Sequence, residues 1–208
     1  NPLNGALISA LYAGFVERYA DRISPEHRAV CDRLVDVFDA YLAADAEADQ
    51  PRGLVHGDYR LDNMLFGDGL TVVDWQTVTW GPVLADAAYF LGCALPSEVL
   101  RAHYDELLAA YHEGLGPDAG IDLGTVRDGV RRQSFFGVIM AIASSMMVER
   151  TERGDEMFMT MLSRHCQHVL DSGAMAVLDN ATPPAPLQPE PSDEDIHPAG
   201  DDVFWNES

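Results

Sequence analysis

Two short apolar runs with a turn between them constrain this chain more than any other feature of its sequence. Met64–Phe66 and Thr71–Val73 are separated by a segment that begins Gly-Asp-Gly. Because Asp-Gly supplies the positive φ that a tight turn needs, the pattern predicts a short β-hairpin. Asp58 and Asn63 precede the first run, and Asp74 directly follows the second. The two ends of a hairpin lie side by side, so three oxygen-bearing side chains are expected to meet at its mouth.

These three side chains suit a magnesium ion and an alcohol. Mg²⁺ is usually held by one or two carboxylates together with substrate phosphates, so Asn63 and Asp74 are candidate ligands. Asp58 lies five residues before Asn63 and remains available to orient a hydroxyl group. An Asp beside a glycine turn more often bonds to its own backbone, and that interpretation is preferred for Asp62 and Asp68.

Two motifs occur in order around the predicted hairpin. They are His-Gly-Asp-Tyr-Arg-Leu-Asp-Asn at 56–63 and Gly-Pro-Val-Leu-Ala-Asp at 81–86. The arrangement resembles the aminoglycoside phosphotransferase and choline kinase-like family of the protein-kinase-like fold. It is most similar to the subgroup that bears His-Gly-Asp-Tyr-Arg-Leu-Asp-Asn, which includes domains fused to some acyl-CoA dehydrogenases. The strong match covers residues 54–92. The resemblance implies a mainly α chain with a small β-hairpin, forming the C-terminal (large) lobe of that fold, with the N-lobe absent.

The resemblance also implies a reaction. In such enzymes the γ-phosphoryl group of ATP, or of another nucleoside triphosphate, passes to a hydroxyl group of a small molecule. Asp58 would orient or deprotonate that hydroxyl, while Asn63 and Asp74 would bind Mg²⁺ and, through it, the nucleotide. The chain is therefore expected to be an ATP-dependent phosphotransferase with an alcohol group as acceptor.

Three further side chains accompany this expected site. Arg60 stands where protein kinases carry a lysine near the transferring phosphoryl group, and a guanidinium there would stabilise negative charge. An ion pair of Arg60 with Asp62 or Asp86 is an equal alternative. His56 is expected to brace the loop rather than transfer protons. By the resemblance, Asp86 accepts hydrogen bonds from the backbone of the loop and supports it.

Composition limits the partners of this chain. Its formal net charge is −21, and all 13 of its basic residues are Arg. A surface this acidic repels nucleic acid and anionic membranes, so neither is expected as a partner. Kinase-like enzymes anchor nucleotide phosphates with an N-lobe lysine under a glycine-rich loop, and this sequence has neither. The chain also begins at Asn1 without Met, so we expect a fragment that shows little or no turnover alone.

Cysteine usage and hydropathy favour the cytoplasm. The sequence has three Cys and no Cys-x-x-Cys pair, and an odd number argues against a disulfide framework. No signal peptide is visible. The longest apolar run, Phe135–Val148, is too short to span a membrane and predicts a buried helix.

Helical spacing of apolar residues divides the rest of the chain. It predicts helices over 3–20, from Pro25 to about Leu42, and over Leu84–Ala94, Glu98–Glu113, Thr125–Arg150 and Asp155–Leu170. The predicted lobe covers 1–180, with helical support at 1–52, a catalytic and metal-binding core at 53–92, and a helical acceptor-side subdomain at 93–180. The tail, 181–208, holds six Pro and seven acidic residues, which predicts disorder.

Several alternatives remain open on sequence alone. The alternative function is that of a non-catalytic, pseudokinase-like binding or regulatory module. A metal-dependent phosphoesterase would need more His or carboxylate ligands than the loop offers. His165 and His168 are spaced as a metal pair, but exposed histidines near a helix end are the preferred interpretation. Within the resemblance, a hydroxyacyl-CoA acceptor would call for a basic patch such as Arg127, Arg131 and Arg132, and an aminoglycoside for clustered carboxylates.

Overall fold

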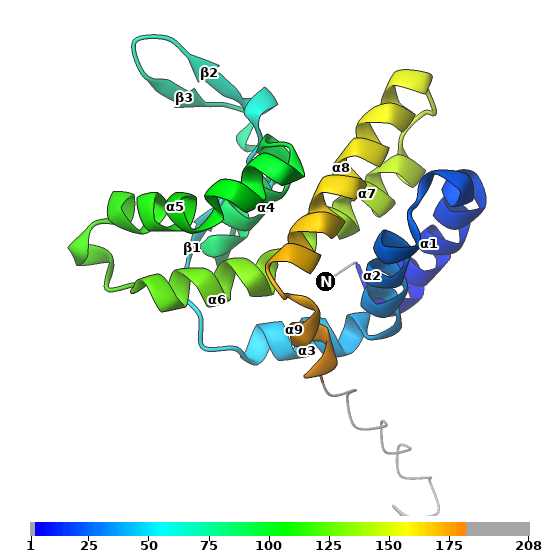
Figure 1. Ribbon diagram of the computed structural model, residues 1–208, viewed down its shortest axis with the longest axis horizontal. Helices are drawn as coiled ribbons and strands as arrows, with labels where there is room; N and C mark the ends of the chain where they lie inside the picture. The colour runs from blue at the N-terminus through cyan, green and yellow to red at the C-terminus, as the bar shows by residue number, and fades with distance from the viewer. Residues whose placement is uncertain (1–2, 182–208) are drawn as a thin grey trace, which may run out of the picture.

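The computed structural model describes residues 3–181, and within them the chain is mainly helical with two small antiparallel sheets (Figure 1). Apart from Ala181, the predicted disordered tail lies outside the described residues. The elements are α1 Gly5–Tyr19, α2 Pro25–Asp36, α3 Phe38–Glu47, β1 Arg52–Val55, β2 Met64–Phe66, β3 Leu70–Val72, β4 Thr79–Pro82, α4 Leu84–Ala94, α5 Ser97–Leu115, α6 Leu123–Gln133, α7 Phe136–Met147, α8 Glu152–Asp171 and α9 Met175–Asp179. A mainly α chain with a small hairpin is thus confirmed.

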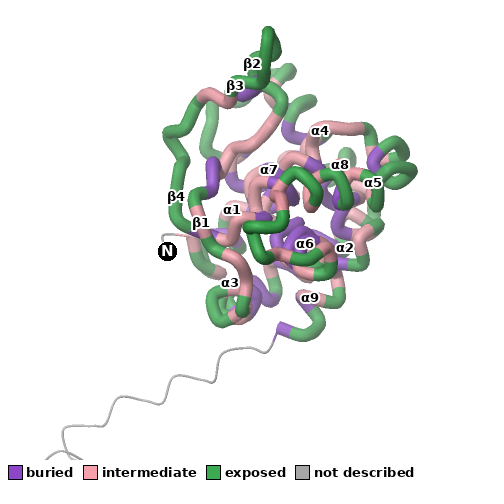
Figure 2. The backbone as a smooth tube through the Cα atoms, turned by 90° about the vertical axis from the view of Figure 1, so that its left-hand side faces the viewer, coloured by how far each residue is buried: buried purple, intermediate pink, exposed green. Residues whose placement is uncertain are grey.

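The predicted hairpin is formed by β2 and β3, in which Met64 pairs with Val72 and Phe66 with Leu70. It projects from the helical body, and most of its residues are exposed (Figures 1 and 2). β1 and β4 form a second antiparallel pair, with Val55 opposite Thr79. This pair joins the two ends of the chain segment that contains the hairpin. The sequence did not predict this pair, because each strand has only four residues and contains Gly.

The helices build two apolar cores. The larger core joins α1, α2 and α3 to α7, α8 and α9, and includes Phe15, Phe38 and Phe135. The smaller core joins α4, α5 and α6, and includes Leu84 and Leu108. Figure 1 shows these two groups of helices on opposite sides of the molecule. The loop that carries the expected site enters from β1 and leaves through β4 into α4, at the edge of the smaller core.

Several predicted helix boundaries are confirmed by their capping interactions. Ser24 caps α2, because its Oγ accepts a hydrogen bond from the backbone N–H of His27 at 3.2 Å. The bounds of α4 are Leu84–Ala94, as predicted. The helix that contains most of the apolar run Phe135–Val148 is buried along much of its length. Gly173, with φ +68°, follows the end of α8.

Two long helices predicted from periodicity are each broken in two. The helix that begins at Pro25 ends at Asp36, since Val37 has φ −110° and ψ 17°, and α3 then continues to Glu47. The helix predicted over Thr125–Arg150 is interrupted at Ser134, whose Oγ donates to the Arg131 carbonyl at 2.9 Å. This second break has a clear consequence, because α6 belongs to the smaller core and α7 to the larger.

His165 and His168 are buried, so the prediction of exposed histidines is wrong. Both lie on the face of α8 that packs against α4, α5 and α7. The ring of His165 stacks on Tyr89 with ring centroids 5.2 Å apart, and its two nitrogens have no hydrogen-bond partner in the described residues. Burial, followed by the neighbouring charge of His168, lowers the pKa of His165 to about 3, so this ring is neutral near pH 7.

Two other predictions concern cysteines and membranes. Cys31, Cys93 and Cys166 are all free, although the buried Sγ atoms of Cys31 and Cys166 approach to 3.9 Å. Among the helices described between residues 3 and 181, none combines the length and the apolarity that crossing a bilayer requires.

The close packing of His165 predicts a strong effect of adding one methyl group. A Cβ at Gly137 would overlap the His165 ring, whereas a Cβ at Gly114 meets no other atom within 4 Å. We expect Gly137→Ala to lower the free energy of unfolding by about 2 kcal/mol or more. Gly114→Ala, the matched control in the exposed part of α5, should instead raise it by about 0.5–1 kcal/mol. Urea unfolding curves measure both, and equal effects would contradict the packing described.

The neutral histidines predict a loss of stability in mild acid. Burial lowers the pKa of His165 to about 3 and that of His168 to about 4, from an ordinary 6.5. Below pH 6.5 the unfolded chain therefore binds protons that the folded protein does not, so stability falls as the pH drops from 6.5 toward 4. Each histidine contributes at most about 1.4 kcal/mol per pH unit. Urea unfolding at pH 7, 6 and 5 gives the change in the free energy of unfolding per pH unit. This change should be smaller for His165→Leu than for the unmodified protein, and an equal change would contradict the burial of a neutral His165.

Candidate active site

The second residue of the loop that joins β1 to β2 is a glycine in a backbone conformation that other residues do not adopt easily. Gly57 has φ +81°, and a Cβ there would lie 2.9 Å from the carbonyl oxygen of Thr77. The hydroxyl of Thr77 donates to the carbonyl oxygen of His56 at 2.6 Å. The segment after the hairpin therefore packs against the start of the loop, which explains the Gly of the His-Gly-Asp motif.

Asp86 holds the same part of the loop from the side of α4. Its Oδ2 accepts the backbone N–H of His56 at 2.6 Å, and its Oδ1 accepts that of Gly57 at 2.9 Å. Both oxygens of one carboxylate are thus used on consecutive peptide groups, and charge-assisted bonds of this kind are stronger than neutral ones. These are the contacts that the resemblance led us to expect of Asp86.

His56 joins the loop to the residue that follows the second strand of the hairpin. The ring is buried, its Nδ1 accepts the backbone N–H of Asp58 at 3.2 Å, and its Nε2 lies 2.8 Å from the carbonyl oxygen of Val73. Since a backbone N–H only donates and a carbonyl only accepts, the imidazole proton is on Nε2. Both nitrogens are engaged by the backbone, which is the arrangement expected of a bracing residue.

Asn63 is oriented by Asp58. Its Nδ2 donates both to the backbone carbonyl of Asp58, at 2.8 Å, and to the carboxylate Oδ2, at 2.9 Å. The carbonyl oxygen of Asn63 also accepts the N–H of Val73 at 2.9 Å, which extends the β2–β3 pairing by one step. With the amide nitrogen fixed in this way, the side-chain Oδ1 remains as the acceptor available to a ligand.

Asp74 follows immediately after the residue that bonds to both His56 and Asn63. Its backbone is left-handed, with φ 64° and ψ 56°, and within residues 3–181 it is the sole residue other than Gly with a positive φ. Such strained conformations are enriched at functional sites. The residue is exposed, and in the described part of the chain no hydrogen bond or ion pair engages its carboxylate. The hairpin therefore brings the backbone of Asp74 to the same mouth as Asn63.

Arg60 forms ion pairs within the loop. Its Nε lies 3.1 Å from Asp58 Oδ2, and its Nη1 lies 2.7 Å from Asp62 Oδ2. Burial acts to lower the pKa of Arg60, but the hydrogen bond that Arg60 donates to Asp58 and the charges of both carboxylates outweigh it and raise that pKa. Of the two pairs considered from sequence, the one with Asp62 is present, whereas Asp86 bonds to the backbone instead. The pair with Asp58 was not anticipated.

Two side chains that interact with Asp58, those of Tyr89 and Cys93, were not identified from the sequence, and neither was Arg164, which contacts Cys93. Burial, followed by the charge of Asp58, raises the pKa of the Tyr89 hydroxyl. Burial also raises the pKa of Cys93 to about 11, against the opposing charges of Arg60 and Arg164. The Nη1 of Arg164 donates to the carbonyl oxygen of Cys93 at 2.8 Å. Tyr89 and Cys93 are four residues apart on α4, so helical spacing from Asp86 was the signal that could have identified this wall.

The residues at the hairpin mouth fit a magnesium ion better than a metal held by protein alone. Among residues 3–181, no cluster of three or more His, Cys, Asp or Glu side chains is arranged to hold a metal. Mg²⁺ needs only one or two carboxylates when substrate phosphates complete its shell. The anchored amide of Asn63, which leaves Oδ1 available, and the unpaired carboxylate of Asp74 meet that limited requirement.

Comparison with known proteins defines the class of this chain. The Phosphotransferase enzyme family (APH) matches residues 9–121, which include the whole loop, the hairpin and Asp86. Because the match covers more than half of the chain, this protein belongs to that phosphotransferase family. The resemblance stated from the two motifs is thereby confirmed.

Two curated relatives are similar over shorter stretches. "Probable acyl-CoA dehydrogenase IBR3" of Arabidopsis thaliana is 33% identical over 69 residues, which is 31% of this chain and 8% of that protein. "Acyl-CoA dehydrogenase family member 10" of Mus musculus is 45% identical over 60 residues, or 26% of this chain and 6% of that protein. The matched stretches thus cover less than a tenth of either relative, and both names agree with the predicted subgroup. No solved structure matches the chain.

The two bonds to Asp86 predict how the loop responds to losing one acceptor. Asp86→Asn replaces one carboxylate oxygen with an NH₂ group that faces a backbone N–H. We expect the free energy of unfolding to fall by about 1–3 kcal/mol, and the amide protons of His56 and Gly57 to exchange faster. Asp68→Asn, in the exposed hairpin turn, is the matched control and should change neither. Unaltered exchange in Asp86→Asn would show that these bonds do not hold the loop.

Proposed function

We propose that this chain carries the catalytic loop of an ATP-dependent phosphotransferase that acts on a hydroxyl group of a small molecule. Asp58 orients the acceptor hydroxyl and takes its proton, while Asn63 and Asp74 are the residues that would hold Mg²⁺. The ion, when bound together with ATP or another nucleoside triphosphate, would neutralise charge on the transferred phosphoryl group. Membership of a phosphotransferase family supports the reaction class.

The observation that carries this proposal is the set of hydrogen bonds that the loop makes to the backbone and the carboxylate of Asp58. His56 fixes the backbone of Asp58, and Asn63 accounts for one contact to Oδ2 of that carboxylate. Arg60 also donates to Oδ2, and the Tyr89 hydroxyl interacts with the same carboxylate. Oδ1 is the oxygen that we propose accepts the proton of the alcohol. Holding a base and an acceptor in fixed geometry contributes much of the rate in such reactions.

Arg60 has a conditional role in this proposal. In the present state its guanidinium is shared between Asp58 and Asp62. The Asp62 carboxylate is 77% exposed, and ion pairs with an exposed carboxylate contribute little to stability, so the arginine can exchange that partner for a phosphoryl oxygen. The guanidinium already lies 3.1 Å from Asp58, and this exchange would bring it onto the phosphoryl group only when the nucleotide is bound.

The nucleotide needs further contacts that these 208 residues do not supply. No Lys occurs in the sequence, and family members that transfer phosphoryl groups anchor the phosphates with one. We therefore propose that an N-lobe outside this sequence completes the nucleotide site. A non-catalytic binding module is the competing proposal, and the intact set of Asp58, Asn63 and Asp74 favours the enzyme.

Replacement of Asp58 tests the proposal directly. In the full-length protein that contains this chain, Asp58→Asn should lower kcat by about 10²–10⁴-fold, because the acceptor loses its base. The dissociation constant for Mg·ATP should stay within about twofold, since Asp58 is not a proposed ligand. Turnover is measured as ATP consumption with a panel of hydroxylated metabolites, and nucleotide affinity by calorimetry.

Asp68→Asn provides the matched control, because it makes the same chemical change in the exposed hairpin turn and should leave kcat unaltered. Equal turnover of Asp58→Asn and the unmodified protein would refute the role of Asp58. Binding of Mg·ATP without turnover of any acceptor by the unmodified protein would favour the binding module.

A further inference from the structure

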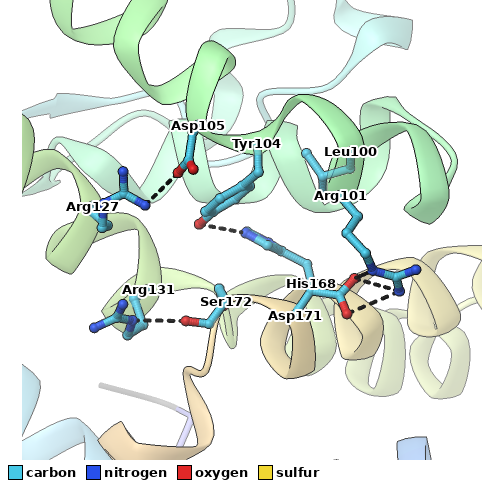
Figure 3. A pocket seen from close by; sticks show the side chains of 9 residues that line it. All are labelled: Leu100, Arg101, Tyr104, Asp105, Arg127, Arg131, His168, Asp171 and Ser172. Carbon is cyan, nitrogen blue, oxygen red and sulfur yellow. Dashed lines mark hydrogen bonds and ion pairs between the residues drawn. The ribbon is translucent and has the colours of Figure 1, made fainter.

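A polar cavity lies between α5, α6 and α8. Its volume is about 310 Å³, and Arg101, Arg127 and Arg131 all line it. Figure 3 shows Arg127 and Arg131 on one side of the cavity and Arg101 on the other, with Tyr104 and His168 between them. None of the residues that line the cavity belongs to the loop, the hairpin or α4. It is therefore separate from the candidate active site.

Three of the 13 arginines of this acidic chain gather around one cavity. Arg101 is held in a bidentate pair, because its Nε and Nη2 donate to the two oxygens of Asp171 at 3.0 and 3.1 Å. That pair is charge-neutral and forms one end of the cavity. Asp105 and Asp171 are the two carboxylates on the lining, and Asp128, just outside it, pairs with Arg131, so each of the three arginines has one carboxylate partner.

Arg127 and Arg131 are less completely paired. Arg127 donates through Nη1 to Asp105 at 2.7 Å, and the carboxylate of Asp105 is 78% exposed. Arg131 donates through Nε to the carbonyl oxygen of Ser172 at 3.0 Å, while Asp128 is 3.4 Å from its Nη1. In the described residues, the Nη2 groups of both arginines have no acceptor. Each guanidinium thus has N–H donors available to a ligand.

The spacing of these two arginines favours an anion between them. They are four residues apart on α6 and therefore lie on one face of the helix, where like charges destabilise by a few tenths of a kcal/mol. A bound anion would relieve this repulsion. Guanidinium groups bind phosphate and carboxylate oxygens in pairs of parallel hydrogen bonds.

The floor of the cavity adds an uncharged donor. His168 is buried, and its Nε2 lies 3.3 Å from the hydroxyl oxygen of Tyr104, while its Nδ1 has no hydrogen-bond partner in the described residues. Burial lowers the pKa of His168 to about 4, so the ring is neutral near pH 7. When the imidazole donates to Tyr104, the tyrosine hydroxyl proton is available to a ligand.

We propose that this cavity binds the phosphate group of a small phosphomonoester, held by Arg127 and Arg131 with a third hydrogen bond from Tyr104. Donors from two helices, α5 and α6, reach the same space, which suits the three terminal oxygens of a phosphate better than the two of a carboxylate. The partners of Arg127 and Arg131 among the carboxylates, Asp105 and Asp128, are both exposed, so these pairs cost little to loosen in favour of a bound anion. The inference does not depend on the proposed transfer reaction.

Calorimetry on the 208-residue chain, without divalent cations and at constant ionic strength, tests the inference. The probes are inorganic phosphate, glycerol 3-phosphate and acetate. Phosphate and glycerol 3-phosphate should bind with one site per chain, and acetate at least about tenfold more weakly. Arg127→Gln and Arg131→Gln should each weaken the binding of both phosphate compounds by about tenfold or more.

Arg153→Gln is the matched control, since it removes an exposed arginine of α8 outside the cavity and should leave the affinity within about twofold. Circular dichroism melting establishes that each variant folds. If Arg131→Gln does not fold, Arg127→Gln still tests the proposal, because it loses only one exposed ion pair. Undetectable binding of both phosphate compounds would overturn the proposal. So would equal weakening by Arg153→Gln, which indicates nonspecific attraction, or acetate binding as tight as phosphate.

Discussion

The hydrogen bonds of one buried imidazole connect the two halves of the candidate site. His56 accepts the N–H of Asp58 through Nδ1 and donates to the carbonyl of Val73 through Nε2. Asp58 lies in the loop before the hairpin, and Val73 lies at the end of its second strand. Without this bridge, the pairing of β2 with β3 would be the main constraint on how Asp74 sits relative to Asp58, and a hairpin of three-residue strands is weak alone.

The helices beneath the loop explain why so exposed a site keeps its shape. α4 presents Asp86 to the backbone of His56 and Gly57, and it buries Ala88 and Leu91 in the smaller core. The same helix places Tyr89 against His165 of α8. α4, which packs in the smaller core and against α7 and α8, thus supports the loop through the Asp86 carboxylate and through the contact of Phe90 with the Tyr59 ring. The strain of the left-handed Asp74 is sustained by this support, since the hairpin itself projects into solvent (Figure 2).

The difference between local motifs and long-range packing explains which features could be predicted from the sequence. The hairpin and the support by Asp86 depend on local motifs of a few residues, so pattern and resemblance were sufficient for both. The breaks at Val37 and Ser134 were missed, because apolar periodicity continues across them and only tertiary packing determines where the helix turns.

Long-range contacts account for the other failures. The burial of His165 depends on Gly92 and Gly137, two small residues from other helices that make room for its ring. Nothing near position 165 in the sequence signals that contact. The pairing of Arg60 with Asp58 likewise depends on how the loop folds back on itself rather than on spacing.

The proposed reaction requires that Asn63 and Asp74 bind the same divalent ion. Broadening of the Asn63 side-chain amide signals by Mn²⁺ and ATP measures this most directly, when it is recorded by NMR in the full-length protein that contains this chain and in its Asp74→Gly variant. Glycine keeps the left-handed backbone at position 74 while removing the carboxylate. We predict that Mn²⁺ broadens the Asn63 signals in the unmodified full-length protein and that the effect is lost in Asp74→Gly. Asn63 signals that stay sharp in the unmodified full-length protein, or that broaden equally in the variant, would contradict a shared site.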